Sequence, residues 1–353
     1  MKKRWLALAL SAVMCAGVFA GCGGSGGDAG NTEAADSQQA EATDAAATEE
    51  AAEQPKDADD SAEAAESAPA AENNGKYALV ISHMTNAFVT TFAENAQAKA
   101  KELGVELTIF DGNKDSATQI SQIESAITQG YAGIMVEPVS VDGIKPAVVA
   151  ANDAGIPVIT VIQKMAEQDL AKSYVGGNDK EAGKLEMEKA IEGMGGKGNI
   201  AILYGPMGSD AQLIRKEGYD EVLAEYPDVS VEFEQTANWV TDEALKITEN
   251  WLQSGKEINA IVSQNDGMAV GAMKAVEDAK MNDQIKIYGI DATPDGLDAI
   301  ANGRMAGTVS QSVAKMGQES MDTLYKVVNG ESVEAEVLMQ PEWVTIDNIA
   351  DYE

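Results

Sequence analysis

Eight polar or aromatic side chains follow apolar runs of this sequence, seven near the end of a run and Arg215 on the next predicted helix, at positions where they could hold a small ligand. Amide, carboxylate and guanidinium groups present hydrogen-bond donors and acceptors in fixed forks, and aromatic rings present flat apolar faces. A sugar or polyol suits that combination, because it carries hydroxyls around its edge and C–H patches on its faces. The residues are Asn86, Phe88, Gln163, Arg215, Trp239, Asn265, Asp291 and Gln311.

The same set lacks the groupings that catalysis or metal binding requires. It holds no Ser/His/Asp arrangement, no paired carboxylates for acid–base work and no His/Cys cluster. We therefore predict a binding protein that is not an enzyme and that needs no cofactor and no metal. His83, the single histidine, also follows an apolar run; it could line the site, but we expect a surface turn residue there.

The segment DGNKDSATQISQ at 111–122 begins like a calcium-binding loop. Ser116 stands where such a loop needs glycine, and Gln122 stands where it needs a bidentate glutamate. We therefore predict a strand-to-helix turn, with Asp115 or Ser116 as the helix N-cap.

Apolar runs alternate with amphipathic helical stretches from residue 77 onward. Strands are predicted at 77–82, 105–110, 133–138 and 156–162, and in a second series at 199–205, 229–235, 258–264 and 285–291. Helices follow, for example near 88–102, 117–129, 142–154 and 209–226. Continuous apolar runs and strand–helix alternation indicate buried parallel sheets, here two doubly wound α/β lobes with a crossing near 173–179. Since such sheets bind ligands beyond the carboxyl ends of their strands, the eight side chains would define a cleft between the lobes.

The first residues have the pattern of an export signal. Three basic residues precede an apolar stretch from Trp5 to Phe19, which is too short and wrongly flanked for a stable membrane span. Cys22 follows FAG directly, as in the lipobox of bacterial lipoproteins, and Cys15 would leave with the signal. Lipidation at Cys22 would explain the odd cysteine of an exported protein; the alternative is a plain signal peptide with an incidental cysteine. We expect 1–22 to be a lipoprotein signal with its lipobox cysteine, anchoring the protein at the outer face of the cell membrane.

Residues 23–75 form an acidic, low-complexity segment with fourteen acidic residues and one lysine. Such a segment buries too little apolar surface to offset the entropy of ordering, so we expect a disordered spacer. The whole chain carries a formal charge of −33, and its remainder is acidic too, which makes nucleic acid and anionic lipid poor partners. We expect a monomer that meets the membrane only through its lipid anchor.

Residues 76–353 resemble the type I periplasmic binding proteins, most closely the ribose-binding subgroup of ABC sugar importers. The segments that carry the resemblance are YALVISHMTNAFVTTFAENAQAKAKELG, AGIMVEPVSVDGIKPAVVAANDAGIPVITV, SQNDGMAVGAMKAVEDA and IYGIDATPDGLDAIANGRMAGTVSQ. The resemblance implies two α/β lobes joined by three crossovers, 76–177 plus 312–338 and 178–311 plus 339–353. It also implies capture of a small neutral sugar or polyol for an ABC importer permease.

The family pattern marks the residues that the strand ends had already selected. It places Asn86 and Phe88 in the first lobe, Gln311 at a hinge crossing, and four residues in the second lobe: Arg215, Trp239, Asn265 and Asp291. Asn265 would then meet a ligand hydroxyl, while Asp266 would cap the following helix.

One position departs from the subgroup. An Asp-Arg pair usually follows the fourth strand, whereas this chain has Ile162-Gln163. A neutral amide recovers only part of the free energy of charged hydrogen bonds, so we expect ribose to bind at least about ten times more weakly than the best ligand.

Other functions on the same scaffold need different features. A receptor that presents its closed form to a membrane sensor kinase stays possible from the sequence, because it too needs only ligand-driven closure. An enzyme would need a catalytic set. A transcriptional regulator would need an N-terminal DNA-binding helix pair, where this chain has an export signal and an acidic spacer.

Overall fold

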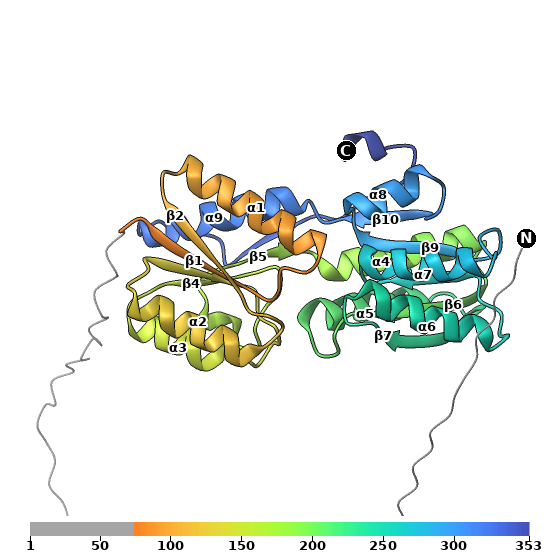
Figure 1. Cartoon of the computed structure of the whole chain (residues 1–353), viewed down its shortest axis with the longest axis horizontal. Helices are drawn as coiled ribbons and strands as arrows, with labels where there is room; N and C mark the ends of the chain where they lie inside the picture. The colour runs from red at the N-terminus through yellow and green to blue at the C-terminus, as the bar shows by residue number, and fades with distance from the viewer. Residues whose placement is uncertain (1–73, 353) are drawn as a thin grey trace, which may run out of the picture. The chain divides into compact units, whose positions relative to one another are not determined.

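The computed structural model describes residues 74–352, which form two β-sheets flanked by helices (Figure 1). The predicted export signal, Cys22 and almost all of the acidic spacer lie outside the described residues. Within 74–352, no helix has the length and apolar character needed to cross a membrane.

The first sheet is parallel throughout, in the order β11-β5-β4-β3-β1-β2. Its strands are β1 (Lys76–Ile81), β2 (Glu106–Asp111), β3 (Gly133–Val136), β4 (Val158–Val161), β5 (Tyr174–Gly177) and β11 (Glu336–Met339). Its helices are α1 (Ala87–Glu102), α2 (Ser116–Thr128), α3 (Lys145–Asp153) and α9 (Val313–Val328), with the short η1 (Gln168–Leu170). We call this unit the first lobe.

The second sheet has the order β12-β10-β9-β8-β6-β7 and is parallel except for the antiparallel pair β10–β12. Its strands are β6 (Gly198–Tyr204), β7 (Val229–Thr236), β8 (Ala260–Ser263), β9 (Lys286–Asp291), β10 (Gly307–Ser310) and β12 (Glu342–Val344). Its helices are α4 (Asp179–Met194), α5 (Asp210–Leu223), α6 (Thr241–Gln253), α7 (Asp266–Asp278) and α8 (Pro294–Ala301), with η2 (Ile349–Asp351). We call this unit the second lobe.

Both sheets are buried on their two faces, as the unbroken apolar runs predict. Along β1, Tyr77, Leu79 and Ile81 pack with α1 and α9, while Ala78 and Val80 pack with α2 and α3. Figure 1 shows these two helix pairs on opposite sides of the first sheet. Successive strand residues point to opposite faces, so one strand serves two apolar cores.

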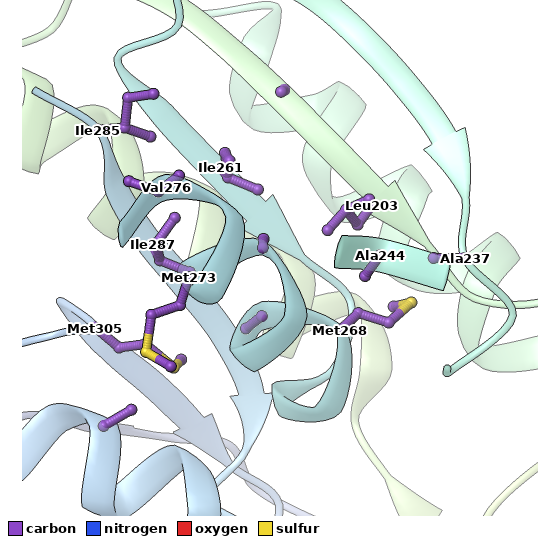
Figure 2. Close-up of a cluster of buried hydrophobic side chains, with 14 of the residues drawn as sticks. Leu203, Ala237, Ala244, Ile261, Met268, Met273, Val276, Ile285, Ile287 and Met305 are labelled. Atoms are coloured by element: carbon purple, nitrogen blue, oxygen red, sulfur yellow. The ribbon is translucent and has the colours of Figure 1, made fainter. Parts of the chain in front are cut away.

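The second lobe repeats this arrangement. Figure 2 shows one of its cores, in which Met268 and Met273 of α7 lie over the sheet residues Leu203, Ile261 and Ile287. A second core of this lobe packs α4 and α5 against the other face of the sheet. The strand ends are therefore held by packing on both sides, which fixes the side chains that follow them.

The chain passes between the two sheets three times. β5 leads through Asn178 into α4, which packs on α5; β10 leads through Gln311 and Ser312 into α9, which packs on α1; and β11 leads directly into β12. This confirms the predicted fold class of two α/β lobes joined by three crossovers. The lobe boundaries 76–177 plus 312–338 and 178–311 plus 339–353 remain our proposal.

Each sheet has six strands, whereas the apolar runs predict four, or five where the run AGTVS at 306–310 is included. The strands that the runs do not reveal include β5, β11 and β12, which have three or four residues and contain glycine or charged side chains. These short strands are held by pairing with a longer neighbour, which an apolar-run criterion does not detect.

Candidate ligand-binding site

The structure brings all eight predicted side chains to one cavity between the two lobes. The lining also includes five further residues: His83, Val89, Glu137, Ile162 and Ala211. The free space is about 40 Å³, far below the roughly 300–1,000 Å³ of a typical small-molecule site. A sugar can therefore enter only when the lobes or their side chains move apart.

Arg215, on α5, is the central cation of the second-lobe wall, which we define as Arg215, Trp239, Asn265 and Asp291. Its Nε donates to Asp179 Oδ1 at 2.8 Å, and its Nη1 donates to the carbonyl oxygen of Gln264. The Arg215 and Asp179 side chains are both almost fully buried. A buried guanidinium held by two acceptors has a fixed direction, so its remaining donors are pre-oriented.

Trp239 lies between β7 and α6 and stands on a positive φ of 61°. A Cβ on Gly205 would come within 2.1 Å of the indole ring, so only glycine lets the ring lie against the end of β6. The Arg215 guanidinium carbon lies 5.8 Å from the ring centroid, which adds a cation–π contact.

Asn265 is the N-cap of α7, with its Oδ1 accepting from the backbone N–H of Met268 at 2.9 Å. The prediction that Asp266 caps this helix is wrong. Asp266 is fully buried and accepts from Thr293 N at 2.8 Å and from Thr308 Oγ1 at 2.6 Å, so it joins α7 to β10 and to the start of α8. Because the cap uses the Asn265 oxygen, its amide nitrogen is the group left for a ligand.

Asp291 ends β9, and its Oδ1 accepts from Gln311 Nε2 at 2.9 Å. Burial raises the pKa of Asp291 well above its usual value, while the Arg215 charge lowers it. Gln311 follows β10 at a crossover, where a Cβ on Gly177 would meet its Oε1 at 2.3 Å. Gln311 at this crossover thus orients a cavity-lining carboxylate of the second lobe.

The first-lobe wall, which we define as Asn86, Phe88, Glu137, Ile162 and Gln163, contains no cation, and the hydrogen bonds of its side chains are made with neutral donors and acceptors or with Glu137. Asn86 is the N-cap of α1, and its Oδ1 accepts from the Val89 N–H at 2.9 Å. Phe88, in the first turn of α1, is buried among the first-lobe core residues.

His83 is buried and lines the cavity, so the expectation of a surface turn residue is wrong. Asn86 Nδ2 lies 3.2 Å from Nε2, and Ser82 Oγ lies 2.8 Å from Nδ1. An amide nitrogen can only donate, so Nε2 accepts and Nδ1 carries the hydrogen. Burial, and then the Lys114 charge, lower the pKa of His83 to about 4, which keeps the ring neutral at neutral pH.

Glu137 is a cavity residue that the strand-end analysis did not select. It follows β3 directly and is 2% exposed, and its Oε2 accepts from the Ser82 N–H at 2.8 Å. Burial raises the pKa of Glu137 to about 7, although hydrogen bonds from Ser82 and Gln163 oppose the shift. The signal was present in the sequence: β3 ends at Val136, so drawing the strand to residue 138 hid a carboxylate at the strand end.

Ile162 and Gln163 follow β4, where the subgroup has an Asp-Arg pair. Ile162 has a φ of 63°, a backbone conformation that is costly for a β-branched residue. Gln163 Nε2 lies 3.4 Å from Glu137 Oε1, and Gln163 Oε1 has no hydrogen-bond partner in the described structure.

One hydrogen bond joins the two lobes at the edge of the cavity. The backbone N–H of Lys164 donates to Asp210 Oδ2 at 2.9 Å. Asp210 begins α5, five residues before Arg215. The cavity and this bond therefore share the same two segments, so contacts made by a ligand there would join the lobes further.

The calcium-like segment is a strand-to-helix turn, as predicted. Asp115 is the N-cap of α2 and accepts from the N–H groups of Ala117 and Thr118. Across residues 74–352, no group of three or more His, Cys, Asp or Glu side chains is arranged to hold a metal ion.

Two α/β lobes, three crossovers and a polar and aromatic cavity at the strand ends define a two-lobed binding protein. Residues 77–332 match the periplasmic binding protein domain family, and the chain belongs to that family. The family consists of binding proteins of transporters and not of enzymes, as the sequence predicted.

Three similar proteins are informative. A xylitol-binding protein of Mycolicibacterium smegmatis is 37% identical over 281 residues, 79% of this chain and 80% of that protein. A ribose import binding protein of Haemophilus influenzae is 32% identical over 260 residues, 74% of this chain and 88% of that protein. The solved structure of an ABC transporter solute-binding protein from Bacillus halodurans with bound myo-inositol has a TM-score of 0.77 and 33% identity, and covers 81% of this chain and 99% of that one.

Proposed function

We propose that this chain captures a sugar or polyol in the cavity between its lobes and delivers it to an ABC importer. The observation that carries the proposal is the convergence on one cavity of eight side chains from both lobes, which stand at strand ends or on the helices that follow them. Two aromatic rings and several hydrogen-bonding forks in one small space match a ligand with apolar faces and a hydroxylated edge.

The similar proteins support a hydroxyl-rich ligand. Two of them are named for xylitol, a linear polyol, and for ribose, a pentose. The solved structure contains myo-inositol, a cyclic polyol. These three compounds share hydroxyls and little else. We assign this chain a ligand with that shared chemistry.

The residues would divide the task by chemistry. Phe88 and Trp239 would cover the ligand's C–H faces, while Arg215 would donate to adjacent hydroxyls through its fork. Asp291 would accept from hydroxyls, and the Asn265 amide nitrogen would donate. Asn86 and Gln163 would form hydrogen bonds to the ligand from the first lobe, and Gln311 would hold Asp291 in place.

Closure would couple binding to delivery. The free space is too small for a sugar, so the ligand must enter a more open form and be enclosed as the lobes return. A ligand that contacts both walls stabilises the closed form by its difference in affinity for the two forms. A permease that recognises the closed form would then receive only loaded protein.

A thermal-shift screen of the full chain against sugars, polyols and amino acids tests this function. A ligand present at about 100 times its dissociation constant adds about 2.7 kcal/mol to the free energy of unfolding. At least one sugar or polyol should raise the melting temperature. A screen in which only amino acids do so would contradict the proposal.

We further propose that the protein is a monomer held at the outer face of the cell membrane by lipid on Cys22, after removal of an export signal. The support is the FAGC junction and the otherwise unexplained cysteine. Cys22→Ser should move the protein from the membrane fraction to the soluble fraction, because it removes the side chain to which the anchoring lipid would be attached. Unchanged fractionation would contradict the anchor and leave the binding function untouched.

A further inference from the structure

The buried charges of the described residues are strongly unbalanced. Six carboxyl groups are buried, and one guanidinium is the only buried cation among residues 74–352. The carboxyls belong to Glu137, Asp179, Glu186, Asp210, Asp266 and Asp291, and the guanidinium belongs to Arg215. A buried carboxylate without a cation is costly unless it is protonated or a partner arrives.

Two of these carboxyls line the cavity, and they differ in what compensates them. Asp291 faces the field of Arg215, which lowers its pKa, and it accepts from Gln311. For Glu137, the described structure shows neutral donors only: the Ser82 N–H, the Ser82 hydroxyl and the Gln163 amide. Glu137 is therefore the cavity carboxyl that lacks a cation.

No charged group contributes to the pKa shift of Glu137, and Arg215, the cation that lines the same cavity, is paired with Asp179. Lys164 Nζ pairs with Glu336 at 2.8 Å, and Lys114 is exposed to solvent. The single histidine, His83, stays neutral near pH 7 because its pKa is about 4. The protein itself thus supplies no positive charge to Glu137.

Gln163 adds a second unmet acceptor beside Glu137. The residue is 7% exposed, its Nε2 lies 3.4 Å from Glu137 Oε1, and its Oε1 is buried without a partner. β3 and β4 are neighbours in the sheet, so the two side chains project from adjacent strand ends. A carboxylate and an amide oxygen side by side, both short of donors, suit a group with several N–H donors and a positive charge.

We infer that the ligand of this cavity carries a protonated amine, and that Glu137 and the Gln163 side-chain oxygen receive it. The inference rests on the proposed function. It narrows the sugar or polyol to one in which an amine replaces a hydroxyl, and it departs from the neutral ligand expected from the sequence. The second-lobe wall would still bind the remaining hydroxyls.

The test is calorimetric titration of the full chain with matched pairs of ligands at pH 7. The pairs are glucosamine with glucose, aminodeoxy-xylitol with xylitol, and aminodeoxy-myo-inositol with myo-inositol. In at least one pair the amine should bind at least about ten times more tightly than its hydroxyl counterpart, as a charge-assisted hydrogen bond predicts. Glu137→Gln should reduce this ratio to about one.

Two further variants test whether the preference for the amine arises at Glu137. Gln163→Lys would supply the missing cation from the protein, so it should also abolish the preference for the amine even if Glu137→Gln folds poorly. Glu106→Gln, at the exposed start of β2, removes the same charge far from the cavity and should leave the ratio unchanged. Together these variants separate a local contact from a general electrostatic effect.

The pH dependence of the ratio gives an independent readout. Because the pKa of Glu137 is about 7, its carboxyl takes up a proton as the pH falls below that value. The preference should therefore decline between pH 7 and pH 5 toward the ratio of about one that a neutral side chain gives. Arg215, Asp291 and His83 line the same cavity. The same titration of Glu137→Gln, in which the decline should vanish, therefore isolates the contribution of Glu137.

The outcomes separate this inference from the proposed function. The inference of a protonated amine would be contradicted if the hydroxyl compound bound equally well or more tightly in every pair. It would also be contradicted if the preference for the amine persisted in Glu137→Gln. In either case the proposal of a sugar- or polyol-binding protein would stand. Binding of neither member of any pair, nor of any other sugar or polyol in the screen, would overturn both.

Discussion

The two walls of the cavity differ in how firmly their polar groups are held. On the second-lobe wall, Arg215 is bound to Asp179 and to a backbone carbonyl, and Asp291 is bound to Gln311. On the first-lobe wall, Gln163 Oε1 has no partner in the described structure, and Glu137 meets neutral groups only. One wall has its hydrogen bonds largely complete before a ligand arrives, and the other does not.

This difference indicates that the two walls contribute differently to affinity and to selectivity. Pre-oriented donors and acceptors bind hydroxyls at a small entropic cost, because their side chains are already ordered. Unmet buried groups discriminate among ligands, because a ligand that cannot satisfy them leaves a desolvated polar atom unpaired. We therefore expect the second-lobe wall to supply most of the affinity and the first-lobe wall to choose the ligand.

Removing the Arg215 charge should give the largest effect. Arg215→Met leaves the Asp179 carboxylate buried without its cation, which costs about 3–5 kcal/mol of folding stability. Ligand affinity should fall at least about 100-fold. Chemical denaturation and calorimetry measure the two effects.

Arg215→Lys serves as a milder variant, because it keeps the charge and loses the fork. Lys216→Met is the matched control: Lys216 is a more exposed neighbour paired with Asp220 at 2.7 Å, and its loss should cost less than about 1 kcal/mol. Wild-type affinity in Arg215→Met would mean that the second-lobe wall does not carry the binding.

Asp291→Ala should weaken binding by about 2–4 kcal/mol, since it removes a buried acceptor and leaves ligand hydroxyls unpaired. Asp295→Ala, in the first turn of α8, is the control for the loss of an acidic side chain outside the cavity. Isothermal titration gives the affinities. Unchanged affinity in Asp291→Ala would remove this residue from the site.

The first-lobe wall can be tested by restoring the subgroup's pair. Ile162→Asp with Gln163→Arg should raise ribose affinity at least about tenfold, near 1.4 kcal/mol, and should lower affinity for the native ligand. Aspartate also tolerates the positive φ of 63° better than isoleucine does, and the new arginine would supply Glu137 with a cation.

In the unmodified protein, ribose should bind at least about ten times more weakly than the best ligand. Ile162→Asn is the control, because it relieves the same backbone conformation and adds no charge. Submicromolar ribose binding to the unmodified protein, with no tighter ligand in the panel, would show that the pair is dispensable.

The smallest predicted effect separates two roles of Asn265: capping α7 and donating a hydrogen bond to the ligand. Asn265→Ala should cost about 1 kcal/mol of stability through the lost N-cap, in addition to weakening ligand binding. Asn265→Ser keeps a capping oxygen and removes the amide donor, so it should retain stability and still lose affinity. Equal binding by Asn265→Ser and wild type would leave Asn265 as a helix cap alone.

The sequence predicted the cavity well because parallel sheets bring the ends of distant strands together. The eight selected side chains all line the cavity, although they are spread over residues 86–311. Glu137 was missed because a strand boundary was placed two residues too late, and boundaries are the weakest part of such predictions.

Two assignments depended on contacts that local patterns do not contain. Asn265 and Asp266 both favour helix caps, and the choice between them follows from partners of Asp266 that lie 27 and 42 residues away. His83 likewise lines a cavity together with Arg215 and Trp239, which lie far along the chain, so the residues around it in the sequence do not reveal its burial.

A crystal structure of the full chain with the tightest ligand from the screen tests the central claim most directly. We predict the ligand between the two walls, with Phe88 and Trp239 against its C–H faces, hydroxyls at Arg215 and Asp291, and its most strongly donating group at Glu137. A ligand bound elsewhere, for example in the surface hollow beside Lys197 and Lys286, with the interlobe cavity unchanged, would contradict the account.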